Sequence, residues 1–280
     1  MRAPLLAGLA LALALPLQAT AQARQDDTPL DRLTRRDQLS GWEAVGRVDI
    51  GDDRFCTGVL IAPDLVLTAG HCLVSKPDFK PVDPAIVRFR AGLSDGKSVA
   101  ERRVIQTVIH PEYYDQKAKR FDHVETDIAL MKLESPIPTN IAAPFAIAEQ
   151  DVGRSVSVVS YARGRSEALS WQRSCSVIGV WPGAAGFTCD VTYGASGAPV
   201  FDTSRRRPMI VSVISRGRFD DGKPVSYGPI IGPPIAELKE ALRTANGVNM
   251  AGGGLASAVQ RTENARFVKP NSGGARFVKP

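Results

Sequence analysis

The sequence predicts an all-β protein made of two halves, and three features point to this fold class. Short apolar runs rich in β-branched residues recur between Trp42 and Ile214. Turn-forming residues separate them, since the 280 residues include 25 Gly and 20 Pro. A Pro-containing segment, 135–140, divides the region into two parts. These features favour a barrel or a sandwich in each half over a helical bundle.

The expected strands are the apolar runs 57–61, 65–67, 86–89, 104–109, 128–133, 156–161, 176–180 and 210–214. One helix is expected near the end of the chain, beginning at Pro233 and Pro234. Its apolar face is formed by residues at three- and four-residue spacing, namely Ile235, Leu238, Ala241 and Leu242. Gly247 is a suitable stop, and we expect the helix to dock on the second half.

The first 23 residues have the features of a secretory signal peptide. A basic start is followed by an apolar run from Leu5 to Leu17 and by small residues at 21 and 23. This run is too short to cross a membrane, which requires about 20 residues. Residues 24–40 form a charged leader or a propeptide, with a dibasic pair at Arg35 and Arg36. We therefore expect a secreted or periplasmic protein without a membrane span, in which cysteines pair.

The positive charge is concentrated near the C-terminus. The chain carries +6, of which the signal contributes +1 and residues 249–280 contribute +4, leaving +1 for 24–248. The globular part therefore gives no electrostatic reason to bind nucleic acid. Residues 248–280 are expected to form a flexible basic tail, in which Ala-Arg-Phe-Val-Lys-Pro occurs at 265–270 and 275–280. The alternative is a recognition tail for an anionic surface or partner.

Three segments carry residues suited to catalysis. His71 follows a strand and small residues in Leu-Thr-Ala-Gly-His-Cys, Asp127 begins the buried run 127–133, and Ser196 lies in Gly-Ala-Ser-Gly-Ala-Pro. Taken singly, they could be a structural histidine, a strand cap and a glycine-rich turn. A serine hydroxyl becomes a nucleophile when a histidine accepts its proton and an acid orients that histidine. The sequence offers one residue for each role, in the order His, Asp, Ser.

With these motifs in that order, the chain resembles the chymotrypsin-like (trypsin-like) serine protease family, bacterial secreted type, over about residues 42–245. The segment Ile-His-Pro-Glu-Tyr at 109–113 also matches the family. The resemblance implies two packed antiparallel six-stranded β-barrels, 41–137 and 138–247, with the C-terminal helix in the second unit. It makes Ser196 the nucleophile, His71 the general base and Asp127 its orienting acid. It places the oxyanion hole at the backbone N–H groups of Gly194 and Ser196.

The resemblance also assigns the cysteines and the specificity residues. Cys56 matches a family disulfide with Cys72, and Cys175 would pair with Cys189; reduced thiols or a metal site are the alternative. Asp190 stands where trypsin-like members select Arg or Lys.

In the same way, Ser215 and Gly217 match the segment that lines the pocket and binds the substrate backbone, with Gly217 leaving the entrance open. Ile214 argues against Glu-specific relatives, which carry a His there. Ala195 replaces the Asp of animal digestive members, so activation by a buried new N-terminus is not expected.

The sequence thus predicts a secreted serine endopeptidase that acts on proteins or peptides, with a preference for Arg or Lys on the acyl side. We expect a monomer without a cofactor or metal. His110 and His123 are expected to be structural. The competing hypothesis is a non-catalytic secreted binding or adhesion protein on the same fold.

Overall fold

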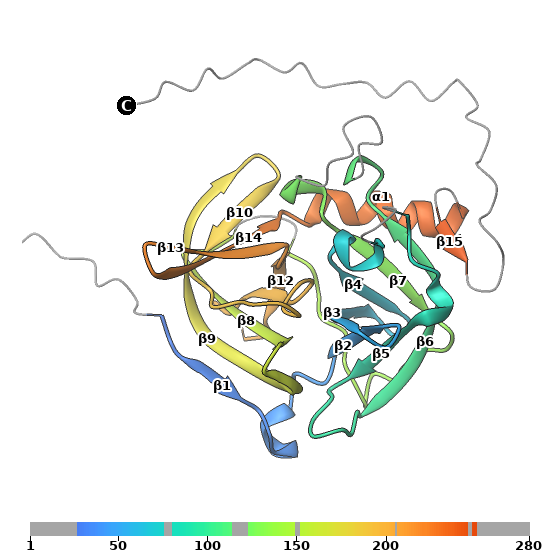
Figure 1. Cartoon of the computed structure of the whole chain (residues 1–280), viewed down its shortest axis with the longest axis horizontal. Coiled ribbons are helices and arrows are strands. Elements are labelled where there is room, and N and C mark those ends of the chain that lie inside the picture. Colours follow the sequence, from blue (N-terminus) through green and yellow to red (C-terminus); the bar gives the residue numbers. More distant parts are fainter. Residues whose placement is uncertain are drawn as a thin grey trace, which may run out of the picture.

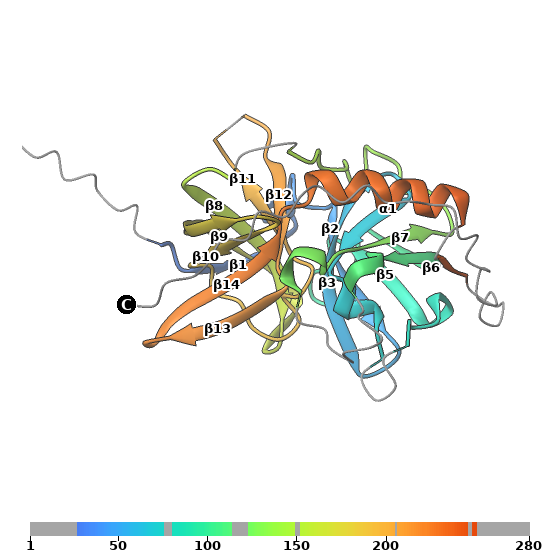
Figure 2. The ribbon, with the colours of Figure 1, turned by 90° about the horizontal axis from the view of Figure 1, so that it is seen from above.

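The computed structural model describes residues 27–75, 80–113, 123–148, 152–204, 206–245 and 248–250. Their fold is mostly β, with strands in two packed units and one α-helix (Figures 1 and 2). The predicted signal peptide, Gly247 and the repeated hexapeptide lie outside the described residues. Among the described residues, no helix combines the length and apolar character needed to cross a membrane.

The first unit is a closed barrel of six antiparallel strands. In chain order they are β2 (Val45–Ile50), β3 (Arg54–Ala62), β4 (Leu65–Thr68), β5 (Val87–Ala91), β6 (Ala100–Ile109) and β7 (Ala129–Leu133). The pairing order is β6-β5-β2-β3-β4-β7, and a ladder between β6 and β7 closes the barrel. Closure satisfies the strand edges that an open sheet leaves unpaired.

The second unit is a curled sheet. Its strands are β8 (Ser155–Ala162), β9 (Arg165–Trp181), β10 (Ala184–Phe187), β11 (Pro199–Asp202), β12 (Met209–Val213), β13 (Arg216–Asp220) and β14 (Lys223–Pro229). They pair in the order β12-β11-β8-β9-β10-β14-β13. Single hydrogen bonds join β12 and the residues after it to β14, from the Ser212 hydroxyl to the Pro229 carbonyl (2.7 Å) and from Ser215 N–H to the Tyr227 carbonyl (2.9 Å). The predicted all-β fold with one C-terminal helix is confirmed. The second unit differs from the expected six-stranded barrel, because its path has seven strands and no closing ladder among the described residues.

Short helices connect the strands. The 3₁₀ turns are η1 (Arg36–Leu39), η2 (Gly70–Leu73), η3 (Pro84–Ile86), η4 (Pro111–Tyr113) and η5 (Val124–Thr126). The one α-helix, α1, spans Gly232–Thr244 and begins with prolines in its first turn, as predicted. The predicted strand at 86–89 starts at Val87, because Pro84 sets a 3₁₀ turn before it.

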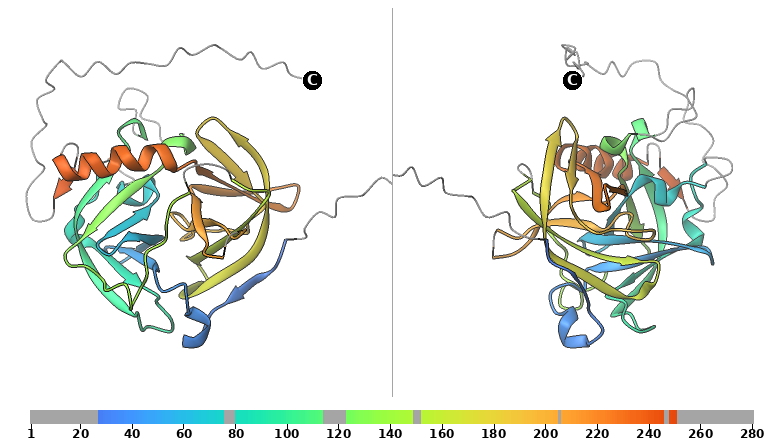
Figure 3. Two further views of the ribbon diagram at one scale, coloured as in Figure 1. Left: turned by 180° about the vertical axis from the view of Figure 1, so that it is seen from behind. Right: turned by 60° about the vertical axis from the view of Figure 1, so that its left-hand side comes forward.

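The helix docks on the first barrel, so our expectation that it packs on the second half was wrong. Helix α1 contacts β6 and β7, and it lies over that barrel in Figures 2 and 3. Ile235 and Leu238 are buried in the core that contains the first barrel. After the last strand of the second unit, the chain therefore returns to the first barrel. There the apolar stripe of α1 covers the outside of the barrel where β6 pairs with β7, which we call the β6–β7 seam.

The described parts of the predicted leader and tail, residues 27–40 and 248–250, each contain a short strand. In the leader, β1 (Leu30–Arg32) pairs with β9, while Leu33 and Leu39 are buried. In the tail, β15 (Val248–Met250) pairs with β6. Charged residues surround the few apolar residues of the leader, and β15 is a three-residue segment next to a glycine-rich run, so neither pattern predicts a strand.

Candidate active site

A buried carboxylate holds the imidazole of His71. Asp127 follows η5 and is 2% exposed. Its Oδ1 accepts a hydrogen bond from the His71 backbone N–H (2.8 Å), and its Oδ2 lies 2.7 Å from His71 Nδ1. A carboxylate only accepts, so Nδ1 carries the proton and Nε2 is left as the acceptor.

A third donor completes the surroundings of this carboxylate. The Ser215 hydroxyl, 88 residues away in sequence, donates to Asp127 Oδ2 at 2.5 Å. Three donors therefore offset the desolvation of the buried charge. The family resemblance places Ser215 in the segment that binds the substrate backbone, and the structure adds a hydrogen bond from its side chain to the acid.

Ser196 lies in a tight turn that only small residues permit. Gly194 and Gly197 have φ of 96° and 77°. A Cβ on Gly194 would come within 2.3 Å of the Phe55 ring, and one on Gly197 within 2.2 Å of Thr68 Oγ1. Glycine is therefore required at both positions by backbone conformation and by space.

The backbone N–H groups of Gly194 and Ser196 have fixed directions, because the carbonyl of each of these two peptide groups accepts a hydrogen bond. The Tyr193 carbonyl accepts from Arg163 N–H (2.7 Å), and the Ala195 carbonyl accepts from Ala198 N–H (2.9 Å). In trans peptides the N–H points opposite to the carbonyl, so the N–H groups of Gly194 and Ser196 point away from these partners. Within the described residues, neither amide donates to another protein group.

Sequence reasoning missed Thr57, which ties the Ser196 turn to the first barrel. This fully buried β3 residue donates its backbone N–H to the Ser196 carbonyl (2.8 Å). Its hydroxyl donates to the Gly194 carbonyl (2.9 Å) and accepts from Tyr161 N–H (3.0 Å). Its position directly after Cys56 was the only signal in the sequence.

His71 and Ser196 line one cleft of about 260 Å³. The other lining residues are Asp53, Arg54, Phe55, Cys56, Cys72, Arg163, Tyr193 and Gly194. The cleft therefore brings the predicted base, nucleophile and one oxyanion-hole residue together.

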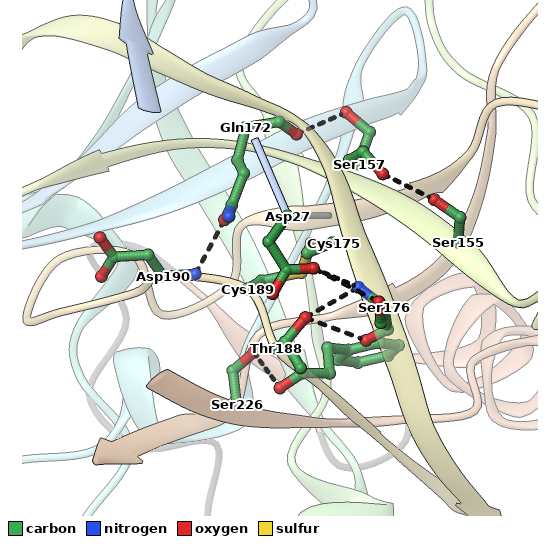
Figure 4. The surroundings of a disulfide bond; sticks show 12 residues. Asp27, Ser155, Ser157, Gln172, Cys175, Ser176, Thr188, Cys189, Asp190 and Ser226 are labelled. Carbon is green, nitrogen blue, oxygen red and sulfur yellow. Dashed lines mark hydrogen bonds between the residues drawn. A yellow bond between two sulfur atoms is a disulfide. The ribbon is translucent and has the colours of Figure 1, made fainter. Parts of the chain in front are cut away.

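The predicted specificity residues lie elsewhere. Asp190, Ser215 and Gly217 are not among the residues that line this cleft. Asp190 is half-buried, and its backbone N–H donates to Gln172 Oε1 (2.8 Å), with its carboxylate turned away from the neighbouring disulfide (Figure 4).

Val191 closely approaches Gly217. A Cβ at Gly217 would lie 2.4 Å from a methyl group of Val191, so Val191 already occupies the space beside it. Near Asp190, the Arg165 guanidinium donates to the Ser160 carbonyl and hydroxyl (3.0 and 3.1 Å). Burial lowers the pKa of Arg165, while the Asp190 carboxylate acts in the opposite direction.

Both predicted disulfides are present, between Cys56 and Cys72 and between Cys175 and Cys189. Ligand-type atoms of Cys56, His71 and Cys72 lie within 4.8 Å of one another. Because both sulfurs are bonded to each other, this group has no thiolate to offer a metal.

The other two histidines lie outside the cleft. His110 follows β6 directly and is buried, and burial lowers its pKa. His123 precedes η5, and its Nδ1 is 3.5 Å from Glu125.

Fold and site together define a class of protein: a β-barrel packed against a curled β-sheet, with an acid-bound imidazole and a serine in one cleft. A family model described as the trypsin-like peptidase domain matches residues 56–207, more than half of the chain. The chain therefore belongs to the trypsin-like peptidase family, as the sequence motifs predicted.

Relatives and solved structures agree with this family. A trypsin from Saccharopolyspora erythraea is 35% identical over 98 residues, covering 35% of this chain and 37% of that protein. Serine protease 28 from Mus musculus is 35% identical over 86 residues, covering 30% and 28%. The match thus spans well under half the length of these curated relatives.

Two solved structures share the fold. A Glu endopeptidase in complex with MPD has a TM-score of 0.62 at 21% identity, covering 79% of this chain and 97% of that one. A thermostable serine protease from an extremophilic microorganism has a TM-score of 0.61 at 22% identity, covering 73% and 99%. At these identities the likeness describes the fold alone.

Proposed function

We propose that this protein is a serine endopeptidase that cleaves proteins or peptides through an acyl-enzyme formed on Ser196. The observation that carries the proposal is the 2.7 Å contact between His71 Nδ1 and the Asp127 carboxylate. It leaves Nε2 as a proton acceptor in the cleft that also holds Ser196.

In the proposed mechanism, His71 Nε2 takes the Ser196 hydroxyl proton while Oγ attacks the scissile carbonyl. Asp127 fixes the imidazole tautomer and stabilises the imidazolium that forms. The N–H groups of Gly194 and Ser196 stabilise the oxyanion, a contribution of about 2.7–4 kcal/mol per donor in related chemistry. His71 then returns the proton to the leaving amine, and water releases the acyl group by the same steps.

Replacing Ser196 with Ala tests this proposal. We expect kcat for a peptide mixture to fall by about 10⁴-fold or more, because no other group supplies the nucleophile. Circular dichroism should show an unchanged fold, since Ser196 contributes only its backbone to the contacts with Thr57. Retained turnover in a pure sample would refute the assignment.

A fluorophosphonate probe separates the peptidase from the competing binding protein. Labelling of wild-type protein at Ser196, lost in His71→Ala, indicates an activated hydroxyl. Absence of labelling favours a non-catalytic role on the same fold.

The finer part of the proposal is a preference for Arg or Lys on the acyl side, carried by Asp190. The nearby Arg165 guanidinium works against this preference, because a substrate cation needs an available carboxylate. Cleavage-site profiling decides the matter. Enrichment of Arg or Lys that is lost in Asp190→Asn supports Asp190 as selector, whereas small or aromatic residues would remove it from the site.

We also propose export to the periplasm or the cell exterior. The two disulfides support an oxidising compartment, where such bonds persist. Fractionation of the producing cells, with N-terminal sequencing of the mature chain, tests this. Cytoplasmic protein that retains residue 1 would contradict it.

A further inference from the structure

Two arginines that form no ion pair within the described residues line the cleft beside Ser196. Arg54, at the start of β3, is half-buried and donates to the carbonyls of Cys72 (2.8 Å) and Val74 (3.1 Å). Within the described residues it forms no ion pair, and burial lowers its pKa because the charge loses solvent. Its fork is held by neutral carbonyls, which leaves three of its five N–H donors unassigned.

The second cation comes from the other β-unit. Arg163 follows β8, is exposed, and places its guanidinium 5.0 Å from the centre of the Tyr193 ring. No carboxylate pairs with it in the described part of the chain. The aromatic face restricts the position of the guanidinium while leaving its N–H donors at the edge free.

One carboxylate in the cleft opposes these cations. Asp53 also lines the cleft and is exposed. Counting only the formal charges that line the cleft, two Arg and one Asp leave it at +1. A substrate carboxylate would therefore meet more positive than negative charge in this cleft.

The position of this charge relative to the scissile bond follows from the proposed chemistry. His71 must protonate the leaving amine, so the substrate residues after the scissile bond lie beside His71. The cleft continues from His71 to the Cys56–Cys72 disulfide. It includes none of residues 215–217, the segment that the family resemblance assigns to the acyl side. The guanidinium pair thus lies on the leaving-group side.

We propose that Arg54 and Arg163 form a subsite for an acidic side chain, Asp or Glu, within the first two substrate residues after the scissile bond. This inference rests on the proposed peptidase function. The unassigned N–H donors of the two guanidinium groups suit a carboxylate, and one arginine from each β-unit would hold the substrate across the junction.

Matched quenched-fluorescent peptides test the subsite. They differ only in carrying Glu, Gln or Lys at the first or second position after the cleaved bond. We expect kcat/KM for the better Glu peptide to exceed that of its Gln counterpart by about tenfold, with Lys poorest. The Glu-to-Gln ratio should fall as salt concentration rises.

Variants locate the effect. Arg163→Gln and Arg54→Gln should each reduce the Glu-to-Gln ratio severalfold, and Asp53→Asn should raise it. Arg163 is exposed, so its variant keeps the test valid if loss of the Arg54 carbonyl contacts disturbs folding. Arg218→Gln is the matched control, because this exposed β13 cation pairs with Asp220 and lies outside the cleft. It should leave the ratio unchanged.

Two failures are distinguishable. Equal rates for the Glu and Gln peptides, or a ratio that Arg163→Gln and Arg54→Gln do not alter, would overturn the subsite while leaving the peptidase proposal standing. If no peptide from a broad mixture is cleaved and no probe labels Ser196, the peptidase proposal fails and the subsite fails with it.

Discussion

Single residues show how the molecule tolerates charge and polarity in its interior. The Asp127 carboxylate is buried with three donors, two from His71 and one from Ser215. Removing one donor from such a group leaves a desolvated charge only partly compensated. The buried Thr57 likewise uses both its backbone and its hydroxyl across the junction. The side chains of Asp127, Ser215 and Thr57 thus hold neighbouring groups of the site in place through hydrogen bonds.

His110 should make folding stability depend on pH. Burial lowers its pKa below the ordinary value near 6.5, against weaker opposing effects of Glu112 and Glu237. The unfolded chain therefore binds the proton more readily, and the stabilisation is present above about pH 6.5 and lost as pH falls below it. We expect His110→Gln to flatten this part of the pH dependence.

Urea unfolding at several pH values between about 7.5 and 5 measures the effect. The half-exposed His123 provides the control, and His123→Gln should keep the wild-type slope. Parallel curves for wild type and His110→Gln would show that His110 is not the responsible group.

At the scale of elements, the attachment of α1 to the first barrel is the least local feature of the fold. Ile235 and Leu238 fill the core at the β6–β7 seam, and the helix contributes no residue to the cleft. The helix therefore stabilises the fold by burying apolar surface. Such burial contributes about 25 cal/mol to the free energy of unfolding per Å².

Leu238→Ala should lower the free energy of unfolding by about 2–5 kcal/mol, because it leaves a cavity at a fully buried position. Lys239→Ala, at the next and exposed helix position, should change it by less than about 0.5 kcal/mol. Denaturant titration of both variants gives the comparison. A loss for Leu238→Ala no greater than for Lys239→Ala would mean that the helix does not dock as described.

At the scale of the whole molecule, one hydrophobic core joins the two units. It combines barrel residues such as Val48 and Leu67 with Val159 and Phe201 of the second sheet. In this core the centre of the Phe201 ring lies 4.6 Å from the centre of the Phe145 ring and 5.1 Å from that of Trp42. A second, smaller core lies within the curled sheet alone.

A shared core predicts that both units unfold together. Differential scanning calorimetry should show one transition, with equal calorimetric and van't Hoff enthalpies. Phe201→Ala should lower its midpoint without splitting it, at a cost of about 3–5 kcal/mol. Two resolved transitions, in either protein, would show that the units are energetically independent.

The sequence by itself determined the local features of this protein. The motifs around His71, Asp127 and Ser196, the small residues of the Ser196 turn and the proline start of α1 are properties of neighbouring residues. Short-range rules of turns and periodicity therefore sufficed to predict them. The family resemblance supplied the pairing of the cysteines.

Only the tertiary structure decided which distant residues meet. The contact of Ser215 with Asp127, the tie from Thr57 to the Ser196 turn and the return of α1 to the first barrel each join segments more than 80 residues apart. The close approach of Val191 to Gly217 could likewise not be predicted from the sequence. Such contacts depend on strand order and on the packing of two units against each other, and local periodicity contains neither.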